Sequence, residues 1–160
     1  MKKILGLFIF LIIGVIATAC SNETIKTKDV EKFVKEYKSE QYNLKDPANL
    51  PTGIEIGDKV KQYLSIDAFD KLNANRVFQI APDFVKKTNK TIELEDVILE
   101  KEKENEDGTI DYNYTLKLKV SDKQSSEVIE KKGQISVSND DGLKITRNWE
   151  DNVKIENVAI

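Results

Sequence analysis

The residues from Thr109 to Val120 restrict the fold more than any other stretch of the chain. Apolar or aromatic residues occupy every even position and polar residues the odd positions between them: Ile110, Tyr112, Tyr114, Leu116, Leu118 and Val120 alternate with Asp111, Asn113, Thr115, Lys117 and Lys119. Because side chains alternate between the two faces of a strand, this pattern predicts a strand with one apolar face. A lone strand cannot bury such a face, so the chain must supply further strands and a covering layer.

The residues before this strand predict another strand that is bent. Ile92 and Leu94 fall in one phase of the alternation, whereas Val97 and Leu99 fall in the other. A shift of one residue would turn the apolar face towards solvent, so we expect a β-bulge between positions 95 and 96. The Asp-Gly pair that follows this strand predicts a hairpin turn.

Two further strands are predicted after the central one. The first contains Gly133, which marks either a bulge or a close approach of another segment, and its apolar residues share one phase: Ile129, Ile135 and Val137. A turn at 139–142 leads into a last strand, in which four residues alternate on one face: Leu143, Ile145, Arg147 and Trp149. Residues 153–160 are expected either to pair at an edge or to stay loose.

Three helical patterns precede the strands. The first carries apolar residues spaced by helical turns, and either Thr27 or Asp29 is expected to cap its start: Val30, Phe33, Val34 and Tyr37. The second pattern covers 56–64, and the third covers 66–74 with Ser65 as its N-cap. These helices can form the layer that covers the apolar face of the sheet.

Composition excludes several classes of function. The chain has 28 acidic and 25 basic residues, no histidine and one cysteine, Cys20. Interspersed charges with a small acidic excess argue against nucleic acid as a partner. The lack of histidine excludes Ser-His-Asp and Cys-His catalysis and His-ligated zinc, and a single cysteine leaves no intrachain disulfide. No carboxylates are paired by their spacing, and the turn at 139–142 lacks the further ligands of a calcium loop. We therefore expect no catalytic residues, no metal and no cofactor.

The first twenty residues have the pattern of a secretory signal. Lys2 and Lys3 precede an apolar run at 4–16 that is shorter than the roughly 20 residues of a spanning helix. Small residues then lead directly to Cys20. This arrangement resembles the lipobox of bacterial lipoproteins, although Ala17 stands where leucine is commonest. The resemblance implies removal of a signal peptide at 1–19 and attachment of diacylglycerol to Cys20.

The expected organisation follows from this N-terminal segment. Residues 20–28 are predicted to be a tether, and 29–160 a single domain on the outer face of the plasma membrane. An uncleaved N-terminal anchor with an idle cysteine is the alternative interpretation of the first twenty residues. Either arrangement places the domain outside the cell.

The order of elements resembles the NTF2-like cone fold. Three short helices precede a four-stranded meander with a bent first strand and a tryptophan in its last strand. The likeness is carried by VKEYKSEQYNL, FDKLNANR, GTIDYNYTLKLKV and EVIEKKGQISVSNDDGLKITRNW, together with the lipobox. Within that fold the chain is similar to small lipoproteins of Gram-positive bacteria, some of them encoded on conjugative elements. The resemblance implies an α+β fold, with N-terminal helices packed into a curved four-stranded antiparallel sheet.

The resemblance also implies a cone with an open end, lined by inward residues of the sheet. Tyr112, Tyr114 and Trp149 are the candidates for that mouth, and Arg147 shares the phase of Trp149. These side chains can hold a small apolar ligand or an extended peptide. Aromatic alternation along a strand mostly indicates burial, however, so a simple core is the favoured interpretation and a ligand site the alternative.

Two functions remain open. One is a lipid-anchored surface module that binds another cell-surface protein, in exclusion or another accessory role in conjugative transfer, as the resemblance implies. Loops at 45–53 and 105–108 are then candidate contacts. The other is an extracytoplasmic carrier that holds a small ligand in the cone.

Overall fold

The computed structural model describes residues 26–140 and 142–160, and in it the alternating segment forms β2 (Ile110–Ser121). β2 lies inside a four-stranded antiparallel sheet of order β1-β2-β3-β4, whose other members are β1 (Thr91–Glu104), β3 (Ser126–Ser138) and β4 (Lys144–Glu150). All even residues of β2 from 110 to 120 are buried. The predicted apolar face is therefore confirmed.

The bend predicted in β1 is also confirmed. The pairing of β1 with β2 shifts between Leu94 and Asp96, so that Glu95 is the extra residue of a bulge. Leu94 before the bulge and Val97 after it are both buried on the same side of the sheet. A regular strand would direct the apolar residues before and after Glu95 to opposite faces of the sheet. The bulge keeps them on the same face.

β4 contains a bulge that the sequence pattern did not reveal. Ile145 pairs with Val137 and Arg147 pairs with Ser136, which leaves Thr146 as the extra residue. The phase of β4 therefore reverses after Ile145. Ile145 is buried, as predicted, but Arg147 and Trp149 are exposed. The prediction that all alternating residues of this strand share one face was wrong for that reason.

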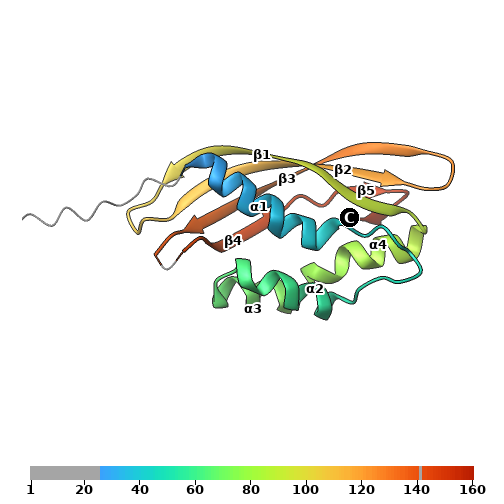
Figure 1. Ribbon diagram of the computed structural model, residues 1–160, viewed down its shortest axis with the longest axis horizontal. Helices are drawn as coiled ribbons and strands as arrows, with labels where there is room; N and C mark the ends of the chain where they lie inside the picture. The colour runs from blue at the N-terminus through green and yellow to red at the C-terminus, as the bar shows by residue number, and fades with distance from the viewer. Residues whose placement is uncertain (1–25, 141) are drawn as a thin grey trace, which may run out of the picture.

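The helical layer covers one face of the sheet, with α1 lying across the strands (Figure 1). Its elements are α1 (Thr27–Tyr42), α2 (Gly53–Val60), η1 (Lys61–Tyr63), α3 (Ile66–Ala74), η2 (Val77–Gln79) and α4 (Ile80–Thr88). α1 begins two residues before the predicted domain boundary. Lys26 occupies its N-cap position without a side-chain cap hydrogen bond, so neither expected cap of this helix forms.

The starts of α2 and α3 follow known capping chemistry. Ser65 accepts a hydrogen bond from the Ala68 amide at 3.2 Å, as predicted for α3. α2 begins earlier than the apolar pattern indicated, because Thr52 and Glu55 form a reciprocal capping box. The apolar pattern did not use these polar residues and therefore missed the first turn.

Two backbone bridges connect the helical layer to both edges of the sheet. Leu44, which follows α1, pairs with Ile92 of β1 through hydrogen bonds of 2.9 and 3.0 Å. Leu64, which precedes α3, bridges to Ile145 of β4, and the Ser65 amide donates to the Ile145 carbonyl at 2.9 Å. The apolar core between the layers thus has backbone connections at both sides.

The C-terminal segment is ordered rather than loose. β5 (Lys154–Ile155) and β6 (Val158–Ala159) form a small antiparallel hairpin of their own. Ile160 is buried, and its amide donates to the Val153 carbonyl at 2.9 Å. None of the helices in the described parts of the chain is both long and apolar enough to cross a membrane.

Replacement of a β2 core residue tests the register. Leu116 is fully buried (0% exposed), so Leu116→Ala should lower the free energy of unfolding by about 2–5 kcal/mol, through lost apolar burial and a residual cavity. Val128→Ala is the control, because Val128 is 53% exposed, and should change it by roughly 0.5 kcal/mol or less. Urea unfolding measures both values. Equal small losses would contradict the register.

Candidate functional site

The four residues predicted at the cone mouth are divided between the two faces of the sheet. Tyr112 and Tyr114 are buried on the inner face, beneath the helices. Arg147 and Trp149 are exposed on the outer face, and Trp149 is 57% exposed. The bulge at Thr146 causes this division. Of these four residues, only Tyr114 and Trp149 line the same surface groove, which is described below.

On the inner face, a buried carboxylate joins three elements. Glu150 of β4 accepts hydrogen bonds from Lys38 of α1 and from the Tyr42 hydroxyl. The Nζ atom of Lys131 on β3 lies 3.2 Å from Oε2 of the same carboxylate. All of these side chains have little or no solvent exposure. We call Lys38, Tyr42, Lys131 and Glu150 the buried ion cluster.

Tyr114 extends the cluster across β3. Its hydroxyl lies 2.8 Å from Asn148 Oδ1 and 3.1 Å from Glu150 Oε1, both on β4. The ring can reach β4 because its cross-strand partner, Gly133, has no side chain. A Cβ at Gly133 would lie 2.5 Å from Tyr114 Cζ and 2.3 Å from the Trp149 carbonyl oxygen. The predicted close approach at Gly133 is confirmed, and the alternative of a bulge there is not needed.

The protonation states of the cluster follow from burial and charge. Burial alone raises the pKa of Glu150, but the charges of Lys38 and Lys131 outweigh it and lower the pKa to about 2. Burial lowers the pKa of Lys38, and the Glu150 carboxylate opposes this change. Burial, together with the Glu150 charge, raises the pKa of the Tyr42 and Tyr114 hydroxyls. Glu150 is therefore an ionised carboxylate that lies beside two lysines and neutral phenols.

Sequence reasoning missed the charged members of this cluster, although a signal existed for two of them. Lys38 follows Val30 and Val34 at four-residue steps, which places it on the apolar face of α1. Lys131 lies between Ile129 and Gly133 in the buried phase of β3. The position of Glu150 had no such signal, because it depends on the unseen bulge in β4.

The cluster fills the place where an open cone would hold a ligand. The large side chains between α1 and the sheet are essentially inaccessible, among them Tyr37, Lys38, Tyr42 and Tyr112. Within the described residues, no group of three or more His, Cys, Asp or Glu side chains is arranged to hold a metal ion. Any partner must therefore be sought on the exposed surfaces.

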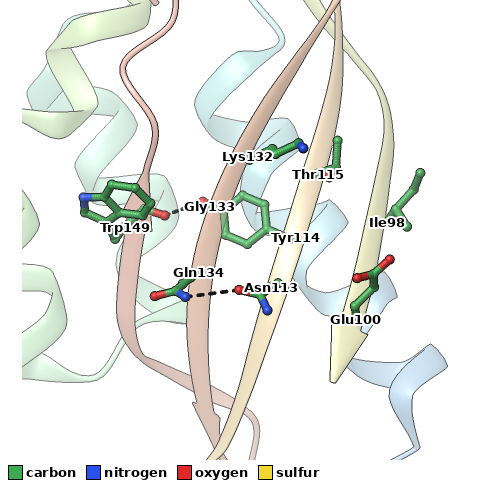
Figure 2. A pocket seen from close by; sticks show the side chains of 9 residues that line it. All are labelled: Ile98, Glu100, Asn113, Tyr114, Thr115, Lys132, Gly133, Gln134 and Trp149. Carbon is green, nitrogen blue, oxygen red and sulfur yellow. Dashed lines mark hydrogen bonds between the residues drawn. The ribbon is translucent and has the colours of Figure 1, made fainter. Parts of the chain in front are cut away.

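One exposed surface is a groove of about 380 Å³ on the outer face of the sheet (Figure 2). Register places one residue from each strand in a row across its floor: Glu100, Asn113, Gln134 and Trp149. Gln134 Nε2 donates to Asn113 Oδ1 at 3.1 Å. We call this surface the sheet groove. It is mainly polar and has one exposed indole at its β4 side.

A second surface lies between α3 and the start of β4 and has a volume of about 450 Å³. Its apolar residues are Leu64, Ile66 and Phe69, and its charged residues are Lys61, Asp70 and Lys144. Ile66 is 78% exposed. We call it the helix groove. An apolar centre with a charged rim is the usual composition of a protein-binding surface.

Comparisons with known proteins give matches only among solved structures; no family model and no curated protein matches. The periplasmic domain of DotI superposes with a TM-score of 0.57 at 8% identity, covering 81% of this chain and 98% of that one. CagV of Helicobacter pylori, a VirB8 homologue of a type IV secretion system, gives 0.54 at 12%, with 78% and 98% covered. The putative transfer protein TraH of the Gram-positive conjugative plasmid pIP501 gives 0.51 at 17%, with 83% and 99% covered. The fold is NTF2-like. At these identities the comparisons show the architecture that this chain shares with those domains, and the predicted α+β cone is confirmed.

Removal of the buried charge should destabilise the protein in a pH-dependent way. The folded-state pKa of Glu150, about 2, is below the ordinary value of about 4.3 for the unfolded chain. Its stabilising contribution is therefore complete above about pH 5 and is lost as the pH falls towards 2. Glu150→Gln should lower the free energy of unfolding by about 3 kcal/mol at pH 7 and have little effect near pH 2.

Urea unfolding between pH 2 and pH 7 measures this difference. Glu130→Gln on the exposed side of β3 is the matched control and should change the free energy of unfolding by no more than about 0.5 kcal/mol at any pH. If Glu150→Gln lowers the free energy of unfolding by the same amount at every pH, the assignment of an ionised carboxylate held by lysines is contradicted.

Proposed function

We propose that this chain is a lipid-anchored, extracytoplasmic module that binds another protein and has an accessory role in conjugative transfer. The observation that carries the proposal is the filling of the inner face by the buried ion cluster. A carrier needs a cavity of roughly 300 Å³ or more, closed around its ligand. The buried side chains occupy that space, which disfavours the carrier alternative and directs attention to the surface.

The shared fold supports the biological setting. The solved domains with this architecture include a periplasmic domain of DotI, a VirB8 homologue of a type IV secretion system and a transfer protein of a Gram-positive conjugative plasmid. Two of the matched structures, the domain of DotI and a fragment of TraM, are described as periplasmic. A position outside the cytoplasmic membrane and a partner within a transfer apparatus are consistent with these relatives in fold.

The helix groove is the surface that best fits a protein partner. Ile66 is exposed at the first turn of α3, where it makes an apolar centre with Phe69. Lys61 and Lys144 provide cations at its edge, and Asp70 provides an anion. A few such residues carry most of the free energy of binding in protein interfaces. The loops at 45–53 and 105–108 remain further candidates for partner specificity.

We propose exclusion as the specific role within conjugative transfer. A domain held on the outer face of the plasma membrane by a lipid on Cys20 would meet an incoming transfer apparatus. Binding would then block entry of a related element into a cell that already carries it. The absence of histidine from the chain removes the commonest acid and base of small enzymes, which supports binding over catalysis.

The anchor is tested by replacing the lipid acceptor. Cys20 lies outside the described residues, and its lipidation is predicted from the sequence alone. Cys20→Ala should release the protein into the medium or leave an uncleaved precursor, since two acyl chains hold a protein stably and removal of the thiol abolishes both. Fractionation and mass spectrometry of the N-terminus measure the result. A processed variant that stays membrane-bound would overturn the lipoprotein assignment.

The partner surface is tested by a charge in the helix groove. Expression of the protein alone in a recipient should reduce transfer of its cognate element at least tenfold. Ile66→Glu should abolish this reduction without changing the melting temperature, because an exposed acid at a helix N-terminus is well tolerated and a buried interface charge is not.

Ile54→Glu is a matched control, because Ile54 is 75% exposed in the first turn of α2 and does not line the helix groove. This variant should exclude the element as the wild type does. Unchanged transfer into recipients that display the wild-type protein would rule out exclusion. A loss of transfer from donors that lack the protein would then assign the accessory role to the donor cell.

A further inference from the structure

The sheet groove has a different chemistry from the helix groove. Its exposed apolar residues, Ile98 and Trp149, belong to the two edge strands, β1 and β4. Between them lie polar residues, Gly133 and the buried ring of Tyr114. A protein interface usually requires a continuous apolar centre. The sheet groove lacks such a centre, so a second protein surface is a poor occupant.

The charges of the sheet groove also restrict its ligand. Glu100 supplies one anion and Lys132 one cation, so the lining carries no net charge. Polyphosphate ligands such as nucleic acid require several cations on one face. A ligand that is uncharged but rich in hydrogen-bonding groups matches this balance.

The central amides can both donate and accept hydrogen bonds to such a ligand. Gln134 uses one amide proton to bind Asn113 Oδ1 at 3.1 Å, which orients both side chains. The Gln134 oxygen can still accept and the Asn113 NH₂ group can still donate, so the pair offers an acceptor and a donor. Glu100 adds acceptors, and Lys132 adds donors. Hydroxyl groups, which donate and accept together, are the natural complement of this set.

The indole of Trp149 supplies the remaining element. It is 57% exposed beside Gln134, its cross-strand partner. A flat aromatic ring next to fixed amide groups suits a ring that has an apolar face and a polar edge. The row from Glu100 to Trp149 spans three interstrand spacings, or roughly 14 Å, which is longer than one sugar ring.

We propose that the sheet groove is a saccharide-binding site, with Trp149 stacking on a sugar ring and Asn113, Gln134 and Glu100 binding its hydroxyl groups. The ligand is an uncharged glycan strand of the cell-wall type. The sugar chemistry rests on the groove, whereas the choice of cell-wall glycan rests on the proposed extracytoplasmic location. Such binding would hold the domain against the wall while the helix groove remains open to a protein.

The chain offers a direct probe, because Trp149 is its single tryptophan. Titration of the full-length protein in detergent with a tetramer of β-1,4-linked N-acetylglucosamine should give a saturable change in tryptophan emission. The protein should also sediment with purified peptidoglycan sacculi that have been stripped of protein and teichoic acid. Trp149→Ala should weaken sedimentation at least tenfold, Trp149→Phe should restore part of it, and Gln134→Ala should weaken it several-fold.

Val128→Ala is the control, because Val128 is an exposed apolar residue of β3 outside the groove. This variant should bind as the wild type does. The proposal is overturned if the wild type shows neither signal, if Trp149→Ala sediments as well as the wild type, or if teichoic acid but not the sugar tetramer changes the emission. Ile66→Glu should retain sugar binding, so failure of the proposed protein partner and failure of the saccharide site are separable.

Discussion

The structure depends on one buried carboxylate. Glu150 binds Lys38 of the helical layer and Lys131 of the sheet, and it faces inward only because Thr146 is bulged. Without that extra residue, β4 would direct Trp149 into the core and Glu150 into solvent. Removing one partner would leave a buried charge unpaired, at a cost of about 3–5 kcal/mol. The bulge, the position of α1 and the ion cluster therefore require one another.

This arrangement explains why the two faces of the sheet differ in what they expose. A buried ion cluster is weak evidence for high stability, because apolar residues of similar size often replace one without loss. Its clearer effect here is geometric, because it closes the inner face and fixes α1 against β3 and β4. The same bulge that turns Glu150 inward exposes Trp149 outside. The exposure of Trp149 in the sheet groove is thus a consequence of how the core is closed.

The sequence predicted the parts of the fold that local patterns specify. The alternation in β2 was visible in its apolar residues. The phase slip at Glu95 was visible because apolar residues on both sides of it show the change of phase. The bulge at Thr146 was invisible, because Ile145, Arg147 and Trp149 keep an unbroken alternation that suits a regular strand. That single error put two candidate site residues on the wrong face.

The charged core was missed for a different reason. Lys38 and Lys131 occupy positions in phase with buried residues. A lysine considered without a partner is nevertheless expected to be solvated, because lysine is rarely buried unless it is paired. Burial of each lysine is favourable only with the carboxylate beside it, and that carboxylate comes from a strand more than a hundred residues after α1 along the chain. Local periodicity cannot report such a pairing. The grooves are similarly non-local, because each combines residues from several elements.

The most direct test of this account is the titration of the Glu150 carboxyl group itself. Carbon-13 NMR of the side-chain carboxyl in the folded protein, assigned by comparison with Glu150→Gln, follows its protonation as the pH is lowered. The account predicts a pKa of about 2, with no change of its chemical shift between pH 7 and pH 4. A midpoint near the ordinary glutamate value of about 4.3 would show a solvated carboxylate and contradict the closed inner face.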